Sequence, residues 1–224
     1  MKKTVSLLLL CSLILGSVAS CTNKKEPDIS ISFNESYVEP TQPQGTTTYK
    51  LQETPVKVEV EIDQNIVDLL KSYFDAYNKT ESFSVLKTYT PTEYMEKMDQ
   101  DGKFREYHMH IDSEVFQTSM YWKSLYGEDA IMLLNEIKEV KNLSTDLLGT
   151  ASEYLKDTYN EYDFDASLLK GCEITFNYSI EGSAGSDSSD MTVCAVQFKE
   201  GEPEHDGWKL IMLGTSDLAQ YKKQ

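Results

Sequence analysis

The residue types best suited to binding a metal ion stand together in one run, His108-Met109-His110-Ile111-Asp112. On a strand, His108, His110 and Asp112 would share one face and could bind a metal ion. On a helix, His108 and His110 lie about 200° apart and cannot both bind one ion. The apolar spacing around the run favours a helix, so we expect solvated histidines, and a metal site is the alternative.

Aromatic side chains are dense between residues 73 and 126 and form a second candidate site. Four of them could line a ligand pocket: Tyr73, Tyr77, Tyr107 and Trp122. The alternative is a packed core, because an aromatic stripe at helical spacing is usually buried and a tyrosine hydroxyl reaches water easily.

The sequence has no glycine-rich phosphate loop and no Gly-x-Ser-x-Gly motif, so we expect no catalytic residue of those classes and no cofactor.

Apolar and polar residues alternate from Cys172 to Glu181, as in a strand that is buried on one face. The Gly/Ser-rich segment 182–189 is predicted to be a flexible tip, and 191–198 to be the returning strand of a hairpin. A further turn at 201–207 is predicted to lead to a last strand from Trp208 to Leu213.

This hairpin determines what the two cysteines of the segment can do. With the apolar faces matched, Tyr178 lies opposite Cys194, and Cys172 lies opposite Glu200. The two thiols are then about 20 Å apart along the strands. Because disulfide partners need Cα atoms within about 7 Å, we predict two separate, buried, free thiols and no disulfide.

The start of the chain carries a third chemical signal. Lys2 and Lys3 precede an apolar run from Val5 to Gly16, which is too short to span a bilayer and is typical of a secretory signal peptide. The run ends in Val18-Ala19-Ser20-Cys21, which resembles a bacterial lipobox. The resemblance implies that residues 1–20 are removed and that the Cys21 sulfur carries a diacylglycerol. The alternative is an ordinary secreted protein that is cut near Cys21 by chance.

The net charge of the mature chain excludes some classes of binding partner. The full chain has 21 Lys+Arg and 37 Asp+Glu, and removal of Lys2 and Lys3 leaves 19 − 37 = −18. Such a chain does not bind nucleic acid through phosphates, which requires clustered basic residues. It is equally unsuited to lie flat on an anionic membrane, so lipid on Cys21 must hold it there.

Residues 21–58 are predicted to be a linker, because they hold four of the six prolines and a Thr46-Thr47-Thr48 run. As a coil, this segment would extend roughly 33 Å from the membrane. Its end, from Val56 to Ile62, alternates like an edge strand. The remaining residues, 59–224, are expected to form one domain.

Within that domain, the spacing predicts a helix over residues 64–79 behind Asp63 as N-cap. A short helix is expected over 82–87. The run Thr90-Pro91-Thr92-Glu93 predicts another helix start, with Thr90 as cap and Glu93 closing a capping box.

Three further elements complete the predicted order. Asp101-Gly102 ends the preceding helix, and a helical stripe runs from Phe104 to Trp122. Residues 130–140 are predicted to form a strand, and Ser144 is expected to cap a helix reaching Tyr159.

This α+β order, of helices, a strand, a helix and three antiparallel strands, resembles the nuclear transport factor 2-like superfamily. The similarity is greatest from Glu136 to Leu213, through Leu143-Ser144-Thr145-Asp146 and the closing Gly207-Trp208-Lys209-Leu210-Ile211. Exported bacterial lipoproteins with an uncharacterised domain of this type end in a similar way. The resemblance implies N-terminal helices packed in a curved antiparallel sheet, the cystatin-type cone, and the helices at 91–125 would cap its mouth.

The superfamily contains isomerases, dehydratases and many non-enzymatic domains, so the fold alone leaves function open. The resemblance transfers no catalytic residue to this chain. We therefore expect a non-enzymatic, lipid-anchored extracytoplasmic domain that faces the cell surface or the periplasm and binds a small ligand or an envelope protein. The alternatives are an isomerase, dehydratase or hydrolase with its site inside the cone, and a structural envelope component that acts as a homodimer through its sheet.

Overall fold

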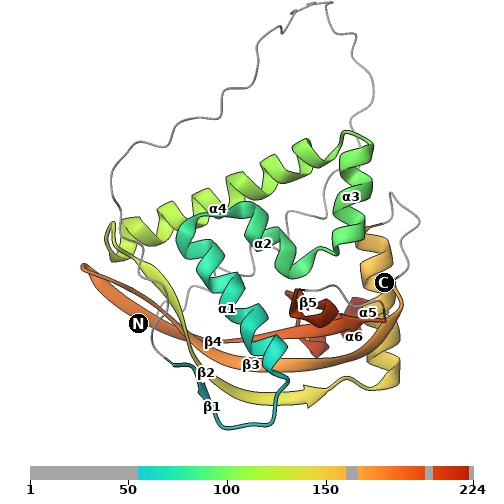
Figure 1. Cartoon of the computed structure of the whole chain (residues 1–224). Helices are drawn as coiled ribbons and strands as arrows, with labels where there is room; N and C mark the ends of the chain where they lie inside the picture. The colour runs from blue at the N-terminus through green and yellow to red at the C-terminus, as the bar shows by residue number, and fades with distance from the viewer. Residues whose placement is uncertain (1–54, 160–165, 200–203, 222–224) are drawn as a thin grey trace, which may run out of the picture. The chain divides into compact units, whose positions relative to one another are not determined.

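The computed structural model describes residues 55–159, 166–199 and 204–221, which form an α+β structure with a five-stranded sheet (Figure 1). Its helices are α1 (Gln64–Lys79), α2 (Ser82–Tyr89), α3 (Thr92–Gln100), α4 (Phe104–Tyr126), α5 (Thr145–Thr158) and α6 (Thr215–Tyr221). Its strands are β1 (Lys57–Val58), β2 (Ile131–Asn142), β3 (Leu168–Gly182), β4 (Gly185–Phe198) and β5 (Trp208–Ile211). The α+β prediction is confirmed at this level.

The strands follow the order β1-β2-β3-β4-β5, and every neighbouring pair is antiparallel except β1 with β2. The sheet is therefore mixed rather than purely antiparallel. Lys57 and Val58, which we placed in the linker, pair with Glu136 and Ile137 and belong to the sheet. Register shifts interrupt β2, and such bulges increase strand bending, in keeping with the curved strands that Figure 1 shows around α1.

The predicted hairpin register is wrong. A two-residue turn between Gly182 and Gly185 joins β3 to β4, so Tyr178 pairs with Ser189 and Cys172 pairs with Ala195. The polar segment that we expected to be a flexible tip continues the strand. Its backbone is paired with β3, while its side chains are exposed to solvent and need no apolar partners.

The predicted first helix is confirmed with its cap, because Asp63 Oδ1 accepts a hydrogen bond of 3.1 Å from the Asn65 backbone N–H. The predicted capping box at the third helix is wrong. Thr90 instead ends α2, where its backbone N–H donates to the Leu86 carbonyl, and Pro91 precedes α3 without a side-chain cap. The pre-proline residue Thr90 is extended, as steric conflict with a following proline ring requires.

Helix α6 follows the last strand and was not predicted. Its start is fixed by Glu173 of β3, whose Oε2 accepts hydrogen bonds from the Thr215 backbone N–H at 2.7 Å and from its hydroxyl at 2.6 Å. Leu218 of the same helix is completely buried. A carboxylate at a helix N-terminus is favoured by the helix dipole, but this contact comes from a distant strand, which sequence spacing does not reveal.

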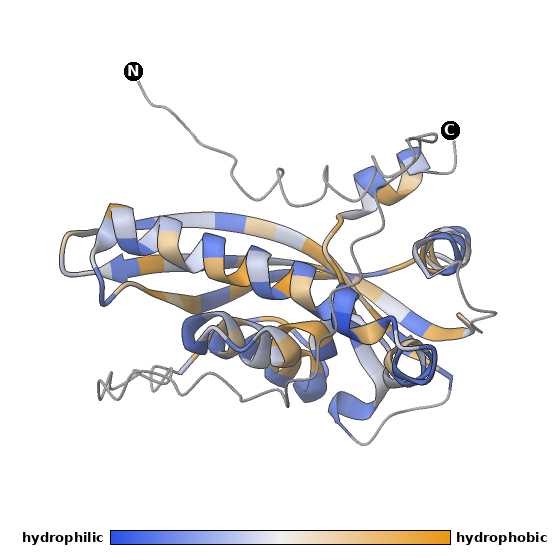
Figure 2. Cartoon of the chain, turned by 90° about the horizontal axis from the view of Figure 1, so that it is seen from above, coloured by the Kyte–Doolittle hydropathy of each residue, from blue (hydrophilic) through white to orange (hydrophobic). Residues whose placement is uncertain are grey.

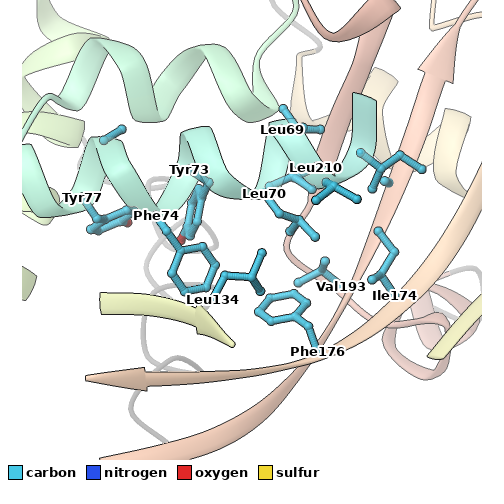
Figure 3. Packing of buried hydrophobic residues seen from close by; sticks show 14 of the residues in the cluster. Leu69, Leu70, Tyr73, Phe74, Tyr77, Leu134, Ile174, Phe176, Val193 and Leu210 are labelled. Carbon is cyan, nitrogen blue, oxygen red and sulfur yellow. The ribbon is translucent and has the colours of Figure 1, made fainter. Parts of the chain in front are cut away.

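The main core lies between α1 and the sheet (Figure 3). Phe74 points from α1 toward Leu134 and Phe176 of the strands, and Tyr73 and Tyr77 lie beside it along the same helix. The Phe74 and Phe176 rings meet edge to face, with centroids 5.8 Å apart. Phe74 is 1% exposed and Tyr77 is 7% exposed, so large rings fill the space that a ligand would occupy in a hollow domain.

A second core cluster covers the other face of the β4–β5 region. It contains Leu86 of α2, Met95 of α3 and Leu155 of α5, together with Val196 and Ile211 of the sheet. The two clusters hold the helices on both faces of the same strands, and they leave α4 with a side that neither cluster covers.

Candidate functional site

Helix α4 carries most of the residues that the sequence marked as candidates, and it is held by contacts along its inner side. Val115 is completely buried there, and Ser119 and Trp122 are buried beside it. The Trp122 ring meets the Tyr77 ring of α1 with centroids 5.9 Å apart. Gly127 ends the helix at a positive φ of 107°, and its N–H donates to the Lys123 carbonyl. These contacts fix which side of α4 faces outward.

A polar contact ties the N-terminal half of α4 to α2. The Ser82 hydroxyl donates a hydrogen bond to Asp112 Oδ1 and lies 2.9 Å from His108 Nε2. Because a hydroxyl has one proton to donate, the His108 Nε2–H must be the donor toward Ser82. The Phe104 ring of α4 stacks on the imidazole at 5.6 Å, and the Phe83 ring of α2 meets it edge to face at 6.0 Å, so His108 is held between the two helices.

These three residue types could suggest a nucleophilic serine, but their geometry does not fit that chemistry. In a catalytic triad the carboxylate orients the histidine through Nδ1, and the serine contacts Nε2. Here Asp112 lies on the Nε2 side at 3.6 Å, next to Ser82. Ser82 is also only 6% exposed, which leaves little of it accessible to a substrate. The arrangement positions α4 and does not provide an activated nucleophile.

The metal alternative at this run requires a strand, and the structure has a helix. His108 and Asp112 lie one turn apart on α4 and contact each other, while His110 is exposed on a different side. No group of three or more His, Cys, Asp or Glu side chains suited to a metal ion occurs among the described residues.

Three of the four aromatic pocket candidates come together. Tyr73 and Tyr77 lie with ring centroids 4.9 Å apart, and Trp122 continues the row from α4. Tyr107 is half-buried and packs against the second cluster. The rings contact one another as core residues do, and the described contacts leave their faces covered by neighbouring side chains.

The hydroxyl groups of this region remain protonated. Burial raises the pKa of Tyr77, with further contributions from Tyr73 and from the carboxylate of Glu114. Burial also raises the pKa of Tyr89, helped by Tyr107 and Glu114. A phenol whose pKa is raised serves poorly as a base near neutral pH, because its phenolate form is scarce.

Sequence reasoning missed Lys209, which is 3% exposed in β5. Its Nζ donates a hydrogen bond of 2.8 Å to the Lys87 carbonyl, near the C-terminal end of α2. A cation at that end of a helix is favoured by the helix dipole. Lys209 therefore links the last strand to α2, and no pattern in the sequence distinguishes it from a solvent-facing strand residue.

The outer side of α4 is the surface that sequence reasoning did not recognise. Met109 is 60% exposed and Phe116 is 57% exposed, and the other large apolar side chains exposed on this helix are Met120, Tyr121 and Leu125. Hydrophobic and hydrophilic segments alternate along the long helix in the view from above (Figure 2). Spacings of seven and four residues from Met109 to Phe116 and Met120 place these three on one face, and this periodicity was the available signal.

Charge is absent from the exposed positions in the C-terminal half of this helix. The exposed positions from Ser113 to Leu125 are Ser113, Phe116, Gln117, Met120, Tyr121, Ser124 and Leu125, and none of them ionises near neutral pH. Depletion of charge together with Met, Phe and Tyr distinguishes the cores of protein interfaces from ordinary surface. In a chain with a net charge of −16, such a face requires an explanation. We call these seven residues, together with Met109, the α4 face.

The predicted lipidation site, Cys21, lies outside the described residues, as do the predicted signal peptide and most of the predicted linker. Among the residues that the structure describes, no helix combines the length and the apolar character needed to cross a bilayer.

Comparison with known proteins finds no matching family, no matching curated relative and no matching solved structure.

Proposed function

We propose that this protein is a lipid-anchored extracytoplasmic interaction module, held to a membrane through Cys21 and using the α4 face to bind a protein partner. The resemblance of Val18-Ala19-Ser20-Cys21 to a lipobox supports the anchor. The proposed domain type is a nuclear transport factor 2-like cone, which the element order and the placement of α1 against a curved sheet support.

The observation that carries the proposed function is the α4 face itself. Large apolar side chains are exposed there without any charge, while the interior beneath α1 is occupied by the rings of Tyr73, Phe74 and Tyr77. Apolar side chains that are exposed together on a surface often mark an interaction site, whereas singly scattered ones are ordinary. An interior filled with aromatic side chains favours an interaction module over a ligand-binding cone.

The proposed localisation also suits this function. A diacylated sulfur gives stable anchoring because two acyl chains bury many methylene groups at about 0.8 kcal/mol each. The acidic chain is repelled by anionic lipid and by nucleic acid, which leaves protein partners as the expected ligands of the α4 face.

A photo-crosslinking amino acid tests the proposed function in cells that make the full chain. The probe replaces Phe116 on the α4 face or, as a matched control, Lys156, which is exposed on α5. We expect discrete protein adducts from position 116 and none from position 156. The absence of protein adducts at position 116, with normal amounts of membrane-attached protein, would overturn the proposal.

A further inference from the structure

We infer that the partner of the α4 face is a second copy of this chain, whose α4 packs antiparallel against the first. This inference rests on the proposed function, because it names the partner of the same surface. A two-fold pair requires a self-complementary face, in which each contact between two residues occurs twice. The α4 face meets this requirement in the sizes of its opposed side chains. The charged residues at its two ends are also complementary.

The size pattern appears when the two-fold axis is placed between Phe116 and Gln117. Each of the two exposed methionines of the helix then lies opposite a serine: Met109 opposite Ser124, and Met120 opposite Ser113. Alternation of large and small side chains lets two helices approach closely with their surfaces in contact. Phe116 lies beside the axis, where burial in a two-fold interface is greatest.

The same axis places Arg105 of one copy opposite Glu128 of the other. Both residues are exposed: Arg105 lies in the first turn of α4, and Glu128 lies beyond its end, after Gly127. About 30 Å of helix separates them, since a helix rises about 1.5 Å per residue, so they cannot pair within a chain. Two symmetric ion pairs would therefore flank the apolar centre and fix the antiparallel orientation.

Net charge does not oppose this contact locally. Although the chain carries −16, residues 103–128 contain three basic side chains and four acidic ones, so this segment carries only 3 − 4 = −1. The basic residues are Lys103, Arg105 and Lys123, and the acidic residues are Glu106, Asp112, Glu114 and Glu128. The helix is thus a segment through which two strongly acidic copies could approach without facing acidic clusters.

An interface of one helix from each copy is small, and contacts below about 1,200 Å² are characteristic of weak or transient complexes. A shared membrane offsets this weakness, because tethered molecules meet at a higher effective concentration. The inferred pair is therefore a dimer of membrane-held copies and is weak when the domain is free in solution.

Disulfide crosslinking of the full chain in its own membrane tests the inference. Gln117→Cys places a thiol beside the proposed axis, and Lys156→Cys places one on α5 as the control. Both native cysteines of the described residues are buried and do not compete. Under mild oxidation we expect Gln117→Cys to form a covalent dimer and Lys156→Cys to remain monomeric.

Charge reversal in the Gln117→Cys background identifies the partner. Arg105→Glu or Glu128→Arg alone creates two like-charged contacts and is expected to slow crosslinking about tenfold. The double variant restores the opposite charges and is expected to recover the original rate. Both changes suit the helix dipole, so the folded domain should tolerate them.

The outcomes separate the two proposals. A Gln117→Cys chain that crosslinks no faster than the Lys156→Cys control, or a double variant that is not rescued, overturns the second copy as partner. If the Phe116 probe still captures a different protein, the proposed function stands without the dimer. If neither probe yields a protein adduct, both proposals fail.

Discussion

Cys172 and Cys194 occupy neighbouring positions on paired strands, but they point to opposite faces of the sheet. Cys172 lies opposite Ala195, and Cys194 lies opposite Glu173, so the two are offset by one residue. One such step reverses the face of a side chain. Cys172 belongs to the core beneath α1, and Cys194 belongs to the core beneath α5 and α6. Both thiols are buried and free, and they lie on adjacent strands one residue out of register rather than about 20 Å apart as predicted.

These thiols should resist modification in the folded protein. Burial raises the pKa of Cys172 to about 11 and that of Cys194 to about 12. At pH 8 the reactive thiolate is then scarce, so iodoacetamide should label neither residue in the native chain and both in denaturant. Peptide mass spectrometry measures the labelling. Rapid native labelling, or a disulfide between the two, would contradict the arrangement.

The core beneath α1 should respond very differently from the α4 face to the same substitution. Phe74→Ala removes a ring that is 1% exposed and should cost about 3–5 kcal/mol of unfolding free energy. Phe116→Ala removes a ring that is 57% exposed and should change stability by about 0.5 kcal/mol or less. Urea denaturation compares the two. Equal losses would show that Phe116 is a core residue rather than an interface residue.

Replacement of two glycines by alanine should change the stability of the domain in opposite directions. Gly149 lies in α5 with no atom within 4 Å of an added Cβ, so Gly149→Ala should stabilise by about 0.5–1 kcal/mol. At Gly182 an added Cβ would lie 2.2 Å from the Tyr126 carbonyl oxygen. Gly182→Ala should therefore destabilise by about 1–3 kcal/mol, because backbone must move. Thermal unfolding tests both, and a neutral Gly182→Ala would refute the close contact between β3 and the end of α4.

The acid stability of the domain should depend on Asp63. Partial burial raises the pKa of this carboxyl, but hydrogen bonds from Asn65 and Trp208 and the nearby Lys170 outweigh it and hold the pKa below the ordinary 3.8. A depressed carboxyl pKa adds stability above the unfolded value, and this stability is lost as pH falls through the folded value. Asp63→Asn should therefore be less stable than the parent at pH 7, with the difference shrinking below about pH 4. A constant difference across this range, in denaturant titrations, would contradict the assignment.

The sequence predicted the elements whose burial pattern is regular. The helix behind Asp63 and the strand around Ile174 each bury one face, and their periods of 3.6 and 2 follow from that burial. The polar half of β4 was misassigned because Ser186 to Asp190 are exposed on a strand, where composition resembles that of a loop. Only the partner strand distinguishes the two cases.

The candidate surface was harder to predict than the fold. The helical stripe predicted from Phe104 to Trp122 accounts for the buried Trp122 as a core residue, and Phe116 and Met120 received no role in that prediction. Whether a second apolar stripe is covered depends on the neighbouring elements, and helix periodicity does not contain this information. Lys209 is the opposite case. Its charged side chain is buried because α2 provides a hydrogen-bond acceptor, and the sequence pattern of β5 does not reveal that contact.

Everything about where this protein works depends on the sulfur of Cys21. The most direct measurement is the mass of the N-terminal peptide of the protein extracted from membranes of the cells that make it. The account predicts a chain that begins at Cys21 and carries a diacylglyceryl group on sulfur, and a Cys21→Ala variant that is released from the membrane. A mature chain that begins elsewhere, or an unmodified Cys21, would contradict it.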